Sequence, residues 1–116
     1  MDEALFRTML FDFYGELLSE KQREYFDLHY NEDLSLAEIA LSEGISRQGV
    51  WDIIRRAEKS MRRFEEKTGL VARFARERDV LAAAEEKLTR IVLARGESAA
   101  LAEEIRRDLQ ELRHGI

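Results

Sequence analysis

The residues with the clearest chemistry lie close together behind Ser46, and their chemistry is that of binding. A helix beginning there would turn five early side chains toward solvent: Arg47, Gln48, Trp51, Asp52 and Arg55. Arginine and glutamine form hydrogen bonds with the base edges and phosphates of nucleic acids. An exposed Trp51 would stack on a base or anchor a partner, whereas an inward Trp51 would fill space beside Tyr30 or Ile54. The sequence leaves both placements open.

A stripe of basic side chains continues along the same predicted helix. Such a stripe can follow a phosphate backbone. Lys21 and Arg23, near the start of the helix that begins at Ser19, would add further backbone contacts. The members of the stripe are Arg55, Arg56, Lys59, Arg62 and Arg63.

Other residues weaken a purely electrostatic interpretation. Asp52 would repel phosphate, Gly49 loosens the helix, and Glu58 interrupts the stripe. Residues 35–66 carry six bases and six acids, so this region has no net charge. Three interpretations therefore stay open: a reader of duplex DNA, a surface for RNA or protein, and a solvated helix face stabilised by pairs four residues apart.

Signals for catalysis, metals and cofactors are missing from the sequence. His29 and His114 are far apart, and neither has an acidic or histidine neighbour at ligand spacing. We expect His29 to be a half-buried structural residue. Ser19, Ser35 and Ser46 are better explained as helix N-caps than as nucleophiles. We therefore expect a protein that is not an enzyme and that carries no cofactor and no metal.

The elements that position these side chains are all predicted to be helices. Apolar residues from Leu5 to Leu18 recur at helical spacing. Ser19 with Gln22 and Ser35 with Glu38 form capping boxes that begin two further helices. Behind Ser46, apolar residues recur at steps of four and three, and this long helix ends at Thr68-Gly69. Its apolar positions are Val50, Ile54, Ala57, Met61 and Phe64.

The segment from Leu36 to Ile54 has the spacing of a helix-turn-helix. Ala40 is small where the second helix packs closely, Gly44 suits a left-handed turn, and Ile45 is expected to plug the core. The predicted fold is therefore all-α, with a helix-turn-helix domain over residues 1–69 and a helical extension over residues 70–116.

The extension carries apolar side chains that need a partner. Phe74, Leu81 and Leu88 recur every seven residues, and a leucine-rich row follows Gly96 at Leu101, Ile105, Leu109 and Leu112. Burying one leucine is worth ~1.5–3 kcal/mol, so we expect this row to be covered. It either packs back within the chain or forms a dimer, and a helical scaffold that uses this seam is a further possibility.

The composition of the chain indicates the cellular compartment in which we expect the protein. The chain of 116 residues has no cysteine and no proline, and its formal net charge is −5. No apolar run approaches the ~18–20 residues that span a bilayer, and the acidic start Met1-Asp2-Glu3 is unlike a signal peptide. Residues 1–34 carry nine acidic and three basic residues, so the excess of negative charge lies in the N-terminal part of the chain. We expect a cytoplasmic protein.

Several motifs resemble known proteins. Ser35 to Ala40, followed by Gly44-Ile45-Ser46-Arg47, is similar to the promoter-reading domain of sigma factors, their region 4. The YlxM family of small bacterial proteins is a closer match. The resemblance covers about residues 5–69 and is carried by Leu10 to Tyr14, Leu17 to Gln22, Tyr25, Tyr30, Ser35 to Ala40, Ser46 to Gln48, Val50, Asp52 and Glu58-Lys59.

The resemblance implies a function and partners. Genes of the YlxM family are typically neighbours of the gene for the signal-recognition-particle GTPase, and the family is cytosolic, helical and dimeric. The resemblance thus implies a regulator of the signal recognition particle pathway that docks on the targeting GTPase or its RNA as a homodimer. The alternative is a dimeric transcription regulator that binds duplex DNA.

Overall fold

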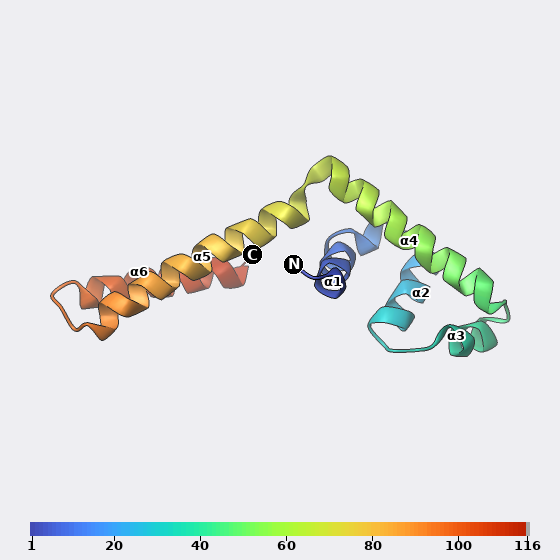
Figure 1. The fold of residues 1–116 in the computed structure, drawn as a ribbon, viewed down its shortest axis with the longest axis horizontal. Helices are drawn as coiled ribbons and strands as arrows, with labels where there is room; N and C mark the ends of the chain where they lie inside the picture. Colours follow the sequence, from blue (N-terminus) through green and yellow to red (C-terminus); the bar gives the residue numbers. More distant parts are fainter. Residues whose placement is uncertain (116) are drawn as a thin grey trace. The chain divides into compact units, whose positions relative to one another are not determined.

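The computed structural model describes residues 1–115, and its elements in this range are helices (Figure 1). They are α1 (Glu3–Tyr14), a short 3-10 helix η1 (Gly15–Leu17), α2 (Glu20–Tyr30), α3 (Leu36–Glu43), α4 (Arg47–Thr68), α5 (Leu70–Leu93) and α6 (Ala99–Gly115). The prediction of an all-α fold is confirmed. The chain divides into two compact units, residues 1–71 and 72–116.

The core of the first unit forms where α4 crosses the preceding helices (Figure 1). Val50, Ile54, Ala57 and Met61 of α4 are at most 1% exposed. They pack in one cluster with side chains of the other three helices, namely Leu10, Tyr14, Tyr25, Phe26, Ile39 and Ala40. The steps of four and three in the sequence therefore identify the buried face of α4, and the opposite face is left to polar side chains.

The predicted caps fix where these helices begin and end. Ser19 and Ser35 each accept a hydrogen bond from the backbone three residues on, and Gln22 and Glu38 bond back, so both capping boxes are present. Gly44 and Gly69 have φ angles of +71° and +63° and end α3 and α4. This left-handed conformation is one that glycine adopts without strain.

The prediction that Ile45 plugs the core is wrong. Its side chain is 40% exposed. The turn at Gly44 leads the chain around the end of α4, and the Cδ1 atom of Ile45 lies 3.7 Å from the position that a Cβ on Gly49 would take. The core contacts at this turn come instead from Ile39 and Val50, which are both fully buried.

The C-terminal end of α4 is tied to α1 by partly buried polar contacts. The hydroxyl of Tyr14 donates to Oε1 of Glu65 over 2.7 Å and also bonds with the hydroxyl of Thr68. The same Glu65 oxygen accepts the backbone N–H of Val71 over 2.9 Å. Burial is the main cause that raises the pKa of Tyr14, so this phenol stays a neutral hydrogen-bond donor.

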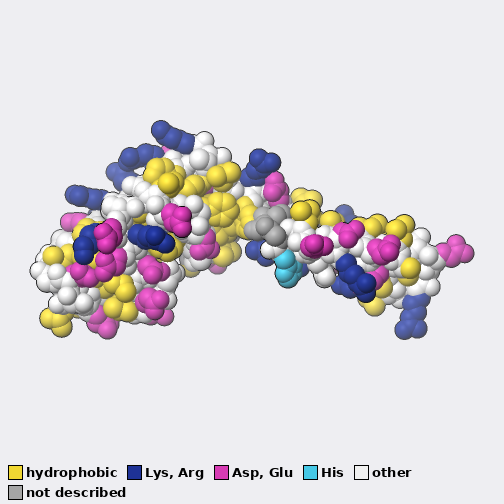
Figure 2. All heavy atoms as spheres, turned by 180° about the vertical axis from the view of Figure 1, so that it is seen from behind, with side chains coloured by type: hydrophobic (Ala, Val, Ile, Leu, Met, Phe, Trp, Pro, Cys, Tyr) yellow, Lys and Arg dark blue, Asp and Glu magenta, His cyan; other side chains and the backbone are white. Residues whose placement is uncertain are grey.

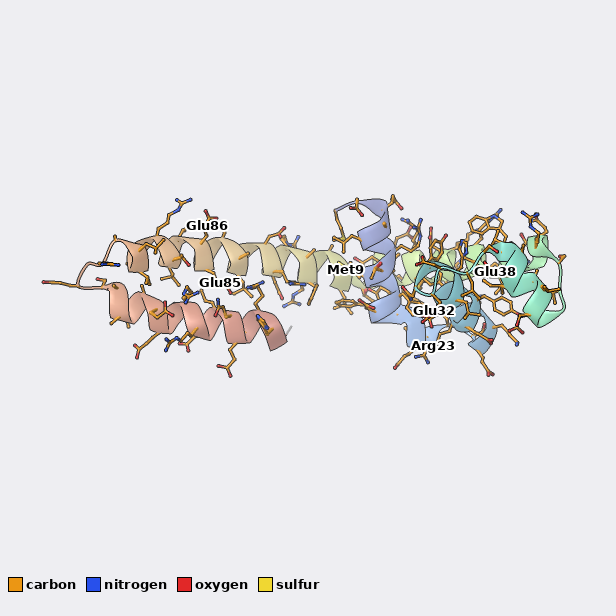
Figure 3. All side chains as sticks on the ribbon, turned by 90° about the horizontal axis from the view of Figure 1, so that it is seen from below. Met9, Arg23, Glu32, Glu38, Glu85 and Glu86 are labelled. Atoms are coloured by element: carbon orange, nitrogen blue, oxygen red, sulfur yellow. The ribbon has the colours of Figure 1, made fainter. Side chains whose placement is uncertain are left out.

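The second unit is an antiparallel pair made by α5 and α6 (Figures 1 and 3). Glu85 of α5 is 9% exposed and points toward α6, where Arg113 lies 3.0 Å from its carboxylate, whereas Glu86 points away (Figure 3). Ala102 is buried on the facing side of α6.

The apolar row of α6 is only partly covered. Leu109 is half-buried, but Leu101, Ile105 and Leu112 are 60%, 39% and 56% exposed. Packing of α6 against α5 within the second unit therefore leaves these three side chains exposed, and docking of the row on the first unit remains one of the two expectations for it. Dimerisation stays a prediction.

Candidate nucleic-acid interface

Helices α3 and α4 form the two arms of the helix-turn-helix. The eight residues of α3 end at Gly44, and Ser46 caps α4 by accepting the N–H of Gly49 over 3.0 Å. Ala40 is 7% exposed, and its small side chain lets α3 approach α4 closely. This geometry presents the first turns of α4 to solvent.

The first turn of α4 carries two exposed polar side chains, Arg47 and Gln48. Gln48 Nε2 donates to Oδ1 of Asp52 over 3.0 Å, so these two candidate base contacts bind each other. Arg47 makes no ion pair within residues 1–115. Within this range it is thus a cation without an ion pair at the tip of the helix-turn-helix.

Gly49 has a packing role in this turn. A Cβ placed on it would lie 3.2 Å from the hydroxyl oxygen of Ser46, which is tight for a carbon contact. The missing side chain therefore leaves room for the Ser46 cap and for Ile45. Gly49 weakens the intrinsic helix propensity of α4, but it permits the turn that places Arg47.

Trp51 lies between two hollows of the surface. It is half-buried, and it lines a shallow hollow with His29, Leu36, Arg47 and Gln48. The ring of His29 meets the indole edge-on, with centroids 6.5 Å apart, and His29 Nδ1 is 2.8 Å from the carbonyl oxygen of Leu34. His29 is half-buried and structural, as predicted. Trp51 is neither fully exposed nor fully buried, so its position lies between the two that the sequence left open.

The second hollow is an open groove of about 500 Å³ along α4, which we call the basic groove. Its wall on α4 carries Arg55, Lys59 and Arg63, one helical turn apart, and none of these makes an ion pair within residues 1–115. Figure 2 shows Lys and Arg side chains projecting along the length of α4. The groove is lined by Arg7, Tyr30, Trp51, Ile54, Arg55, Glu58, Lys59, Arg62, Arg63 and Glu66.

Ion pairs centred on Glu58 join this groove to α1. Glu58 accepts from Nε of Arg7 over 2.6 Å and from Nε of Arg62 over 3.2 Å, and Arg62 also binds Glu3 over 2.7 Å. Burial alone raises the pKa of Glu58, but the two arginines outweigh it and hold the pKa below its usual value. Arg62 is therefore held by acids, whereas Arg55, Lys59 and Arg63 are free for a ligand.

Arg7 and Arg62 each lie over an aromatic ring. The guanidinium of Arg7 lies over the ring of Tyr30 at 4.5 Å from its centroid, and that of Arg62 lies over Phe6 at 5.1 Å. Such cation–π contacts hold the arginines in place.

The remaining candidate residues lie outside the groove. Arg56 is exposed on α4 but does not line the groove. Lys21 pairs with Glu24 and Glu43, and Arg23 points into solvent from α2 (Figure 3). The structure thus brings Trp51, Arg55, Lys59, Arg62 and Arg63 together, and leaves Lys21, Arg23 and Arg56 apart from them.

Five residues that line the groove were not predicted as site residues: Arg7, Tyr30, Ile54, Glu58 and Glu66. Arg7 stands in the acidic front part of the sequence, 51 residues before Glu58. No local spacing connects those two positions. Tyr30 was named in the sequence only as a family-motif residue and as a neighbour of an inward Trp51.

The described residues contain neither a group of three or more acidic, histidine or cysteine side chains that could hold a metal ion, nor a helix long and apolar enough to cross a membrane.

The chain is similar to a described protein family and to several of its members. Residues 1–97 match the family UPF0122, described as "Putative helix-turn-helix protein, YlxM / p13 like". A UPF0122 protein of Thermoanaerobacter sp. (strain X514) is 57% identical over 72 residues, and the match spans only 62% of the length of each chain. UPF0122 proteins of Symbiobacterium thermophilum and Geobacillus kaustophilus (strain HTA426) are 46% identical over 95 residues and 39% identical over 105 residues.

These matches cover 82% and 90% of this chain, and 89% and 96% of the relatives. The resemblance seen in the sequence is thereby confirmed, and the chain belongs to the UPF0122 family of YlxM/p13-like helix-turn-helix proteins.

Proposed function

We propose that this protein is a non-enzymatic regulatory protein of the cytoplasm that binds nucleic acid through its helix-turn-helix surface. The observation that carries the proposal is the free side of α4, where Arg47, Arg55 and Lys59 stand exposed without an ion pair within residues 1–115. A cationic helix face of this kind supplies the phosphate contacts on which nucleic-acid affinity depends. The description of the family as helix-turn-helix proteins points the same way.

In this proposal the binding domain comprises residues 1–69, and residues 70–116 form an extension that makes the protein a homodimer. The exposed Leu101, Ile105 and Leu112 support a role for the extension in association. The contacts proposed for nucleic acid or a partner are Lys21, Arg23, Arg47, Gln48, Trp51, Asp52, Arg55, Arg56, Lys59, Arg62 and Arg63, with Arg62 and Asp52 acting mainly through their neighbours.

The experiment is a titration of the full chain with labelled nucleic acids across a salt series. We expect binding of duplex DNA or RNA at micromolar concentration or tighter, weakening steeply as salt rises. Arg47→Glu combined with Arg55→Glu should reduce the affinity at least tenfold. Arg90→Glu, an exposed change on α5, should leave it unchanged. Absence of binding to every nucleic acid would overturn the proposal.

The finer role that we propose is regulation in the signal recognition particle pathway, by docking on the targeting GTPase or its RNA. It is supported by family membership and by the bond between Gln48 and Asp52, which occupies two side chains that a base reader would need. Separate titrations with the GTPase and with the RNA test this role. If neither binds at micromolar concentration, the pathway assignment is wrong.

The second candidate is a dimeric transcription regulator, favoured by the free Arg47 at the tip of α4. A helix-turn-helix places the N-terminal residues of its second helix against base edges in the major groove. Selection of binding sites from random duplex DNA should then enrich a sequence with twofold symmetry. A selection that enriches no sequence excludes this candidate.

A further inference from the structure

The basic groove combines features that a contact with duplex DNA does not require. At one end stands Trp51, and Arg7 covers the ring of Tyr30 inside the groove. The groove itself is open, with a volume of about 500 Å³. The space is therefore lined by an indole and by a guanidinium that lies over an aromatic ring.

Flat groups of this kind recognise the faces of nucleobases. Indole rings and arginine planes stack on bases, and this stacking is tolerant of sequence because every base has a π-face. In a duplex the faces are covered by neighbouring base pairs and only the edges are accessible. An unpaired base is thus the ligand whose chemistry matches Trp51 and Arg7.

The basic side chains beside the groove have a spacing that suits a strand. Arg55, Lys59 and Arg63 follow each other at four-residue steps, about 6 Å apart along the axis of α4. They are exposed, and they make no ion pair within the part of the chain that the structure describes. The groove is lined by two acids: Glu58 is neutralised by two arginines, whereas Glu66 is exposed and makes no ion pair within residues 1–115.

We propose that the basic groove binds a run of unpaired nucleotides, with a base stacked on Trp51 and the backbone phosphates on Arg55, Lys59 and Arg63. The inference rests on the proposed function, because it names which nucleic acid that function uses and where it lies. Single-stranded RNA and single-stranded DNA share this chemistry, so both enter the test.

The experiment uses the full chain and its own fluorescence, because Trp51 is the single tryptophan. The probes are a 12-nucleotide oligouridylate, a 12-nucleotide oligodeoxythymidylate and a 12-base-pair DNA duplex. Stacking on Trp51 quenches its emission, so we expect both single strands to quench it and to bind at least tenfold more tightly than the duplex.

Variants then locate the contacts. Changing Arg55, Lys59 and Arg63 together to Gln removes three phosphate contacts, and we expect the slope of log affinity against log salt to become shallower by about two. The control Lys87→Gln changes an exposed lysine of α5 that does not line the groove, and it should leave both affinity and slope unchanged. With a labelled strand, Trp51→Leu should weaken binding about tenfold and Trp51→Phe less.

The outcomes separate this inference from the proposed function. Tighter binding of the duplex than of both single strands, or an unchanged affinity in the triple variant, overturns the inference and leaves the function standing. Loss of all nucleic-acid binding in the unmodified chain overturns both. Tighter binding of oligouridylate than of oligodeoxythymidylate would identify single-stranded RNA as the ligand of the groove. Equal binding would show that the groove accepts unpaired strands of either kind.

Discussion

At the scale of single residues, Glu58 decides which basic groups of α4 are held and which are free. Its side chain is 24% exposed, as is that of its partner Arg7. The pair Arg90–Glu86, by contrast, is 74% and 67% exposed, and surface pairs of that kind add little to stability. We therefore expect the Glu58 contacts to stabilise the first unit.

The variant Glu58→Gln tests this expectation. It keeps a hydrogen-bond acceptor but removes the charge that faces Arg7 and Arg62, so the free energy of unfolding should fall by about 1–2 kcal/mol in urea titrations. Glu32→Gln, a change at an exposed acid beyond the end of α2, is the matched control and should change it little. Equal effects of the two variants would show that the ion pairs are only surface contacts.

The same carboxylate predicts a dependence on pH. Its pKa lies below the ordinary value of 4.5 in the folded chain, so between the two values the unfolded chain binds more protons. The stabilisation from Glu58 is therefore complete above about pH 5 and is lost as the pH falls through the folded-state pKa. The stability difference between the unmodified chain and Glu58→Gln should shrink from pH 6 to pH 3. A constant difference would assign the effect to packing.

At the scale of elements, the ends of α3 and α4 are set by glycines in a left-handed conformation. Nothing lies within 4 Å of the Cβ that an alanine would add at Gly44 or Gly69, so the penalty there comes from the backbone alone. Gly96 is equally open but does not have a positive φ angle. The three glycines thus form a matched set.

Each of Gly44→Ala and Gly69→Ala should lower the free energy of unfolding by about 1 kcal/mol, measured by circular dichroism in urea. Gly96→Ala should have no such effect. Gly44→Asn should recover part of the loss, because asparagine tolerates this conformation better than alanine. If Gly44→Ala proves neutral, the turn does not depend on the left-handed residue.

The elements could be predicted from the sequence because their signals are local. The boxes at Ser19 and Ser35, the glycine at position 44 and the apolar steps from Val50 to Met61 each involve residues within a few turns of one another. Ile45 was misassigned because an apolar residue beside a turn has no periodicity that shows which side it faces.

The candidate site was predictable only in part. The wall of the groove on α4 could be read from the four-residue spacing of Arg55, Lys59 and Arg63. Its other wall could not, since Arg7 reaches Glu58 across 51 residues and only the folded chain brings them together. Arg62 is held by a local pair with Glu58, four residues before it, and by a long-range contact with Glu3 that no local spacing predicts.

At the scale of the whole molecule, the two units differ in how much they bury. The first has a continuous core made from α1 to α4, together with Val71 in the first turn of α5. Within the described part of the second, Glu85 and Ala102 are the buried side chains, and Val80, Leu101 and Leu112 are more than half exposed. Two helices with so small a core are not expected to be stable alone.

We therefore predict that a second copy of the chain covers the apolar face of α6. A pair of identical faces is self-complementary about a twofold axis, which is the commonest symmetry of small oligomers. The full chain should behave as a dimer in sedimentation at micromolar concentration. Changing Leu101, Ile105 and Leu112 to Gln should give a monomer, since each leucine that is covered contributes up to ~1.5–3 kcal/mol.

The control for this experiment is Leu41→Gln, which changes an 87% exposed leucine of α3 and should leave the dimer intact. Circular dichroism separates the possible causes of a monomeric signal. If the triple variant becomes monomeric with unchanged helix content, α5 and α6 hold together without the partner and the apolar face serves association alone. If helix content falls with the dimer, association and folding of the second unit are coupled. A monomeric unmodified chain would contradict the prediction.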